Sequence, residues 1–158
     1  MKQTDERPNQ IPWPPIILIS LATIALLLGR FAPLPYARGA AADILAGVGF
    51  VLIVLAVALY ALSARELSRH KTAILPTKGA DRLVVSGPFA ITRNPIYLAN
   101  VILLSGWGLV AGNLWMFGAA LLCGFGEYHL AIRREEAHLE HKFGKAWRDY
   151  RKRVRRWI

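Results

Sequence analysis

Residues 94–126 read NPIYLANVILLSGWGLVAGNLWMFGAALLCGFG and contain no charged side chain. A single helix of that length would be about 50 Å long, whereas roughly 20 residues are enough to cross the hydrocarbon of a bilayer. Gly112 favours the end of one helix, and Asn113 favours the start of the next. The stretch therefore predicts a membrane hairpin of two helices, over about 95–111 and 114–132, that turns at Gly112-Asn113.

Two further charge-free segments precede the hairpin, over residues 8–29 and 44–64. Each is long enough for one crossing, so we expect spans at about 15–31 and 40–64, the second continuing as a helix to His70. A cleaved signal peptide is the alternative for the first segment, but the region before it is long, proline-rich and nearly neutral. The first 12 residues are expected to be loose.

Composition supports the membrane class. A hydrophobic fraction of 54% in 158 residues is too high for a soluble domain of this size, because its core could not bury so much apolar surface. The length is that of one domain. We therefore expect one all-α integral-membrane domain over 1–158, with four transmembrane helices.

Basic residues are distributed unevenly around these spans. Six of the 20 Lys and Arg lie over residues 65–93 and ten over 133–156, while the turn of the hairpin has none. Because positively charged loops stay in the cytoplasm, a multi-pass protein with both termini in the cytoplasm is expected. No nucleic-acid motif accompanies the net charge of +10, so anionic lipid headgroups are the expected partners of the basic C-terminal region.

The segments that flank the hairpin also have a predicted structure. The loop from Thr72 to Thr92 is rich in Pro and Gly, and its hydrophobic Leu83-Val84-Val85 favours an ordered loop. After the hairpin, apolar residues recur at spacings of four, three, four and three: Phe143, Trp147, Tyr150, Val154 and Trp157. This pattern predicts one amphipathic helix, which either lies on the membrane surface or packs on the loop and caps a site.

Polar residues gather where the third span begins. Arg93 precedes Asn94-Pro95, Pro95 fits the first helical turn, and Tyr97 carries a hydroxyl about half a turn further in. Helix starts favour anions, so this one together with Arg93 would suit a carboxylate. For Arg93 alone, the alternative is a side chain that extends to lipid headgroups.

Acidic residues follow the hairpin. Glu127 lies near hydrocarbon depth, where a carboxyl group is costly and usually paired or functional, and Arg134 is its possible partner. Glu135 and Glu136 lie two turns later, and Glu136 is expected to be mostly solvated. Tyr128-His129 could belong to the pocket or to the interfacial belt.

Glycines also lie inside the apolar segments, in Gly47-x-Gly49 and Gly106-x-Gly108. A dinucleotide-binding loop requires a strand before it, so these glycines do not predict a Rossmann-type site. They are instead expected to let helices approach closely.

Six short motifs in the second half of the chain occur in order. They are Leu83-Val84, Gly87-Pro88-Phe89, Arg93-Asn94-Pro95-Ile96-Tyr97, Glu135-Glu136-Ala137-His138-Leu139, Phe143-Gly144 and Trp147-Arg148-Asp149-Tyr150. Their order around an apolar hairpin resembles the isoprenylcysteine carboxyl methyltransferase and phospholipid methyltransferase family of integral-membrane methyltransferases. The resemblance implies a catalytic half over 72–158.

The resemblance also implies that S-adenosylmethionine binds between the cytoplasmic loop, the hairpin and the helix of the glutamates, with the C-terminal helix completing the site. The implied cofactor-binding residues are Leu83, Val84, Phe89, Arg93, Asn94, Pro95, Tyr97 and Glu135. The implied catalytic residues are Arg93, Asn94, Tyr97 and Glu135. Candidates for contact with the acceptor are Glu127, Tyr128, His129 and Tyr150, and no metal is expected.

Three positions depart from the patterns of the family, and the mildest departure is Trp147, which replaces a frequent tyrosine. Asn94 replaces the usual histidine, which keeps hydrogen bonding but loses titration near neutral pH. Ala131 occupies the place of a substrate-facing arginine in the prenylcysteine enzymes, so a prenylcysteine carboxylate is not expected as the substrate.

The implied function is methyl transfer from S-adenosylmethionine to a lipophilic acceptor, a carboxylate, an amine or a thiol, at the cytoplasmic membrane face. The alternatives are a non-enzymatic four-span scaffold, a small transporter, or a cofactor-binding module that has lost catalysis. A proton-coupled transporter would be expected to carry an acidic residue deep in a span, and only Glu127 is a candidate.

Overall fold

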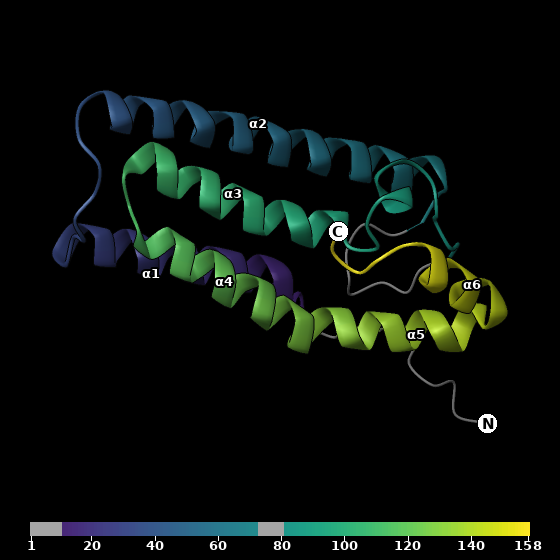
Figure 1. The fold of residues 1–158 in the computed structure, drawn as a ribbon. Coiled ribbons are helices and arrows are strands. Elements are labelled where there is room, and N and C mark those ends of the chain that lie inside the picture. The colour runs from purple at the N-terminus through teal and green to yellow at the C-terminus, as the bar shows by residue number, and fades with distance from the viewer. Residues whose placement is uncertain (1–10, 73–80) are drawn as a thin grey trace.

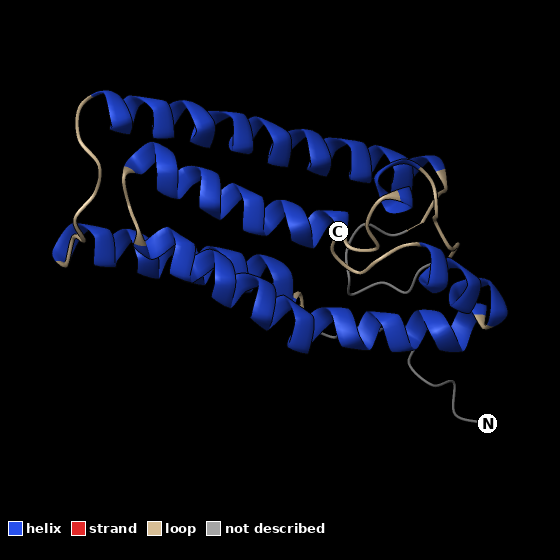
Figure 2. Cartoon of the chain, in the orientation of Figure 1, coloured by secondary structure: helices blue, strands red, loops and turns tan. Residues whose placement is uncertain are grey.

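The computed structural model describes residues 11–72 and 81–158, and within these ranges it is built of helices without a strand (Figure 2). The helices are α1 (Trp13–Phe31), α2 (Ala40–Arg69), the 3-10 helix η1 (Gly87–Ala90), α3 (Pro95–Ala111), α4 (Trp115–Glu127), the π-helical turn η2 (Tyr128–Ile132), α5 (Arg133–Phe143) and α6 (Lys145–Arg153). The all-α class is therefore confirmed. The expected loose N-terminus, over its first ten residues, and residues 73–80 of the predicted ordered loop lie outside the described residues.

The long helices form a bundle in which α2 lies along α3, and α4 packs against α3 and α1 (Figure 1). Small residues permit the close approach of α2 and α3. A Cβ atom added to Gly49 would lie 2.6 Å from the carbonyl oxygen of Gly106, so neither glycine can be enlarged without moving a helix. Gly49, Gly106 and Gly108 thus have the predicted packing role, whereas a Cβ atom on Gly47 would have nothing within 4 Å.

Two helices of the described ranges, α1 and α2, are long and apolar enough to cross a membrane, and α3 is a shorter apolar helix. Large apolar side chains on their surfaces are exposed, among them Ile19 and Ile24 on α1, and Phe50 and Val51 on α2. An apolar surface of this extent favours contact with lipid over contact with water. These helices indicate a membrane protein, while the count of four crossings stays a prediction.

The hairpin turn forms where the sequence predicts it. Gly112 ends α3 in the left-handed conformation, at a φ of 62°, and donates its backbone N–H to Gly108. The side chain of Asn113 accepts a hydrogen bond from the backbone N–H of Trp115 at 3.1 Å and donates one to the carbonyl of Ala25 at 2.8 Å. Asn113 thus helps to start α4 and also ties the turn to α1.

The end of the chain differs from the prediction of a single amphipathic helix. The backbone breaks at Gly144, which has a φ of 51°, and α6 ends at Arg153, so Val154 and Trp157 are not on its helical face. Residues 154–158, called here the C-terminal tail, return to the start of α3 (Figure 1). Trp147 and Tyr150 of α6 are buried against the protein. Of the two placements that the sequence leaves open, α6 therefore has the second, in which the apolar side chains pack on the protein.

Candidate functional site

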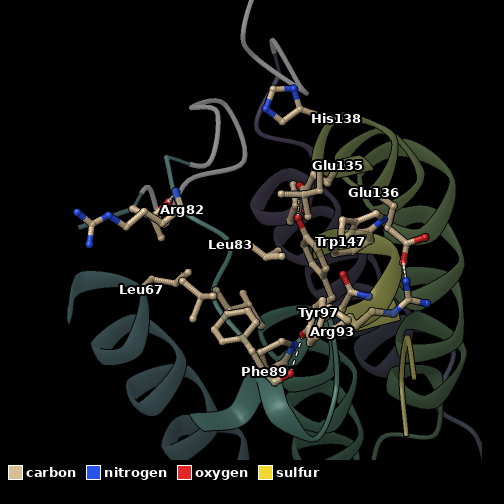
Figure 3. A pocket seen from close by; sticks show the side chains of 18 of the residues that line it. Leu67, Arg82, Leu83, Phe89, Arg93, Tyr97, Glu135, Glu136, His138 and Trp147 are labelled. Carbon is tan, nitrogen blue, oxygen red and sulfur yellow. Dashed lines mark hydrogen bonds and ion pairs between the residues drawn. The ribbon is translucent and has the colours of Figure 1, made fainter. Parts of the chain in front are cut away.

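A cavity of about 400 Å³ lies at the end of the bundle opposite the hairpin turn. Its walls come from the start of α1, the end of α2, the loop before α3, the first turns of α3, α5 and α6 (Figure 3). Ligand pockets for small molecules begin at about 300 Å³, so the cavity has the size of a binding site.

The cavity brings together residues that the sequence singles out. All eight residues of the implied cofactor set line it: Leu83, Val84, Phe89, Arg93, Asn94, Pro95, Tyr97 and Glu135. Of the four acceptor candidates, Tyr150 lines it, whereas Glu127, Tyr128 and His129 are not among its lining residues. The four implied catalytic residues belong to the same lining set, and their roles stay predictions.

Arg93 is held inside the cavity wall rather than extended to a membrane surface. Its side chain is only 8% exposed, and Nη1 lies 3.1 Å from Oε1 of Glu136 (Figure 3). The guanidinium also lies over the ring of Trp147, 5.5 Å from the centroid. Burial lowers the pKa of Arg93, and the neighbouring carboxylate of Glu136 opposes that effect. Within the part of the chain that the structure describes, Nε of Arg93 is buried without a hydrogen-bond partner.

The expectation that Glu136 is mostly solvated is wrong, because its carboxylate is paired with two arginines. Besides Arg93, its two carboxylate oxygens accept hydrogen bonds from Nε and Nη2 of Arg156, at 2.9 and 2.7 Å, and its side chain is 11% exposed. Arg156 lies in the C-terminal tail, 20 residues further along the chain. Local spacing on α5 therefore could not reveal this partner.

Glu135 has a different partner from its neighbour. The hydroxyl of Tyr97 donates a hydrogen bond to Oε1 of Glu135 (Figure 3). Tyr97 is buried in the first turns of α3, whereas Glu135 comes from the first turn of α5. This bond joins the two sides of the helical hairpin at the cavity.

The C-terminal tail fixes the entry into α3. The backbone N–H of Arg93 donates to the carbonyl of Arg155 at 3.0 Å, and Thr92 pairs with Arg155 in an isolated bridge. The hydroxyl of Thr92 and the side-chain amide of Asn94 both donate to the carbonyl of Arg156, each at 3.0 Å. Asn94 therefore holds the tail with its Nδ2, which the sequence does not suggest.

Glu66 is a positioning residue that the sequence analysis missed. It is buried at the end of α2, where its Oε1 accepts a hydrogen bond from the hydroxyl of Ser86. Gly87 follows with a φ of 59°, and a Cβ there would lie 3.2 Å from Cγ of Glu66. Phe89 is held from the other side, because the hydroxyl of Tyr150 donates to its carbonyl at 2.6 Å. Two helices thus fix the loop that carries Leu83 to Phe89.

Glu127 is buried, and its partner is a residue other than Arg134, which the sequence offers as a possibility. Its Oε1 accepts a hydrogen bond from Nδ2 of Asn100, and Oδ1 of Asn100 accepts one from the hydroxyl of Tyr60. Tyr60 and Asn100 line the cavity, so Glu127 is connected to it through them. Asn100 could have been noticed in the sequence, because it continues the three-residue spacing of Asn94 and Tyr97.

Residues 45–146 match the family described as phospholipid methyltransferase, and the chain belongs to this family. Membership indicates a membrane methyltransferase, in agreement with the resemblance seen in the motifs. No solved structure matches the chain.

Three curated proteins illustrate what the chain is similar to. An uncharacterized protein of Haemophilus influenzae is 35% identical over 65 residues, which are 40% of this chain and all of that protein. A Delta(14)-sterol reductase of Mus musculus is 34% identical over 82 residues, and a Delta(24(24(1)))-sterol reductase of Aspergillus fumigatus is 33% identical over 81. Each reductase match covers 51% of this chain but only 19% and 17% of the respective reductase.

Proposed function

We propose that this protein transfers the methyl group of S-adenosylmethionine to a lipophilic acceptor at the cytoplasmic membrane face. Membership in the phospholipid methyltransferase family supports methyl transfer. The observation that carries the proposal is that one cavity combines Arg93, Glu135, Glu136 and apolar walls. The reductase matches cover less than a fifth of each reductase, so they do not support a reductase reaction here.

The side chains present suit the chemical groups of this cofactor. Arg93 lines the cavity, and its guanidinium suits the carboxylate of an amino acid. Glu135 supplies a carboxylate for an ammonium group, and Leu83, Val84 and Phe89 supply apolar surface for an adenine ring. Aromatic faces such as that of Trp147 also attract cations, including a sulfonium.

The task of the protein in such a reaction is alignment. When bound, the cofactor supplies an electrophilic methyl group on a sulfonium sulfur. Residues held by packing and hydrogen bonds, such as Tyr97 on Glu135, fix the geometry of the site. A carboxylate acceptor needs no base, whereas an amine or thiol must lose a proton.

The proposal includes a membrane arrangement. α1, α2, α3 and the continuous α4–η2 segment are the four crossings, with both termini and the cavity at the cytoplasmic side. Six basic residues of α6 and the tail are exposed: Lys145, Arg148, Arg151, Lys152, Arg153 and Arg155. They would contact anionic headgroups, while Trp147 and Tyr150 face the protein.

The direct test is incubation of the purified protein in lipid nanodiscs with S-adenosylmethionine that is labelled in its methyl group, together with an extract of total membrane lipid. The proposal predicts label in a lipid-soluble product, whose analysis identifies the acceptor. The matched control is Arg93→Ala, which should lose most of the transfer. A folded protein that binds the cofactor but labels nothing would favour a binding module that has lost catalysis.

A further inference from the structure

The cavity has a second polar end, away from Arg93. Asn94, Tyr97 and Asn100 follow one another at intervals of three residues, so they lie on one face of α3, and all three line the cavity. From Asn94 to Asn100 the helix rises about 9 Å. The cavity therefore extends along α3 to an inner end formed by Asn100 and Tyr60.

The inner end is polar at one point and apolar around it. Pro14, Pro15 and Leu18 of α1 and Ile96 of α3 line the same cavity. Tyr60 and Asn100 supply the polar atoms, and Asn100 is 4% exposed. A small polar head group that carries an apolar chain matches this combination.

The hydrogen bonds at this end have a fixed direction. Oε1 of Glu127 accepts from Nδ2 of Asn100 when the carboxyl group is ionised, and it can still accept when a proton sits on Oε2. The opposite side of the amide, Oδ1, is thereby turned to Tyr60 and accepts its hydroxyl hydrogen. Since that hydrogen is used, the phenolic oxygen has only lone pairs left for a ligand in the cavity.

We propose that Tyr60, Asn100 and Glu127 form the acceptor subsite, which selects a lipophilic molecule whose head group donates a hydrogen bond, an N–H or O–H. This inference rests on the proposed function, since it assigns the acceptor of that same reaction. Tyr60 contacts the head group, and Glu127 is a positioning residue that acts through Asn100. An ether or an ionised carboxylate brings lone pairs against the lone pairs of Tyr60 and leaves both unsatisfied.

The test compares three probes with the same hydrocarbon chain: hexadecanol, hexadecylamine and hexadecyl methyl ether. Binding to the protein in detergent is measured by native mass spectrometry, with S-adenosylhomocysteine binding measured in parallel. The wild type should favour the alcohol and the amine over the ether by about three- to tenfold, the value of one hydrogen bond. Tyr60→Phe should remove this preference while keeping S-adenosylhomocysteine binding.

Two further variants separate positioning from packing. Glu127→Gln keeps an oxygen that accepts from Asn100 and should keep the preference, whereas Glu127→Met should lose it. Tyr36→Phe is the control, because the hydroxyl of Tyr36 bonds to the carbonyl of Leu109 at the other end of the bundle. Equal binding of all three probes to the wild type, or an unchanged preference in Tyr60→Phe, would overturn the acceptor subsite. A wild-type protein that does not bind S-adenosylhomocysteine would instead count against the proposed function.

Discussion

Arg93 and Glu136 form an ion pair at 3.1 Å inside the cavity wall, although 43 positions separate them along the chain. The same glutamate receives Arg156 from the C-terminal tail, so one carboxylate organises two arginines from distant segments. The ion pair thus orients Arg93, while its buried Nε–H donor stays without a partner among the described residues.

Replacement of Arg93 should weaken cofactor binding strongly. Arg93→Ala removes a charge-assisted contact, and the expected loss is about 1.5 to 3 kcal/mol in the free energy of S-adenosylhomocysteine binding, measured by calorimetry. Arg148→Ala is the matched control, because Arg148 is exposed on α6. Equal losses for the two variants would indicate a general effect of positive charge rather than a specific contact.

Replacement of Glu136 should lower the stability of the protein. Glu136→Ala leaves the buried Arg93 without its counter-charge and releases Arg156, so a loss of about 1 to 3 kcal/mol in the free energy of unfolding is expected. Glu140→Ala is the comparison, since Glu140 forms an exposed pair with Arg151 and should change stability little. The readout is thermal unfolding in detergent, and similar curves for the two variants would contradict the structural role of Glu136.

Removal of the C-terminal tail should disturb the cofactor end of the cavity. Truncation after Val154 deletes the carbonyls of Arg155 and Arg156, which hold Thr92, Arg93 and Asn94. The truncated protein should bind S-adenosylhomocysteine at least about tenfold more weakly, because several hydrogen bonds are lost together. Deletion of Ile158 alone, which is exposed, should leave binding unchanged.

Asn94 should act by hydrogen bonding rather than as a base. Its Nδ2 donates to the carbonyl of Arg156, and a histidine retains a donor whereas leucine has none. Methyl transfer should therefore survive in Asn94→His and fall in Asn94→Leu, as measured with labelled cofactor. Activity that appears only in Asn94→His would mean that the natural protein lacks a necessary base.

The membrane arrangement can be checked by labelling with a membrane-impermeant thiol reagent. Arg38→Cys, in the exposed connection between α1 and α2, should react only from the outside, and Lys145→Cys on α6 only from the cytoplasm. The native Cys123 is buried and should not react from either side. Labelling of Arg38→Cys and Lys145→Cys from the same side would exclude the four crossings proposed.

The sequence predicts the helices and the hairpin well because their signals are local. The bounds of α3 follow from Pro95 and Gly112, and a residue that starts or ends a helix acts within its own turn. The family motifs also identify eight residues that line one cavity. What they bind was implied by the resemblance alone.

The sequence does not predict contacts that depend on the path of the chain after Gly144. The apolar spacing from Phe143 to Trp157 suggests one helix, but backbone bonds between the tail and residues 92–94 take precedence over that periodicity. The solvated role expected for Glu136 is wrong for the same reason, since Arg156 arrives from the tail. Glu127 likewise pairs with Asn100 across the hairpin rather than with a residue of its own helical segment.

Calorimetric titration of the purified, detergent-solubilised protein with S-adenosylhomocysteine tests the central claim most directly. The account predicts saturable binding at one site per chain, which Arg93→Ala weakens and which Tyr60→Phe leaves intact. Absence of any binding by protein that unfolds cooperatively, in detergent and in added lipid alike, would contradict the account, because the cavity lined by Arg93, Tyr97 and Glu135 would then have another ligand.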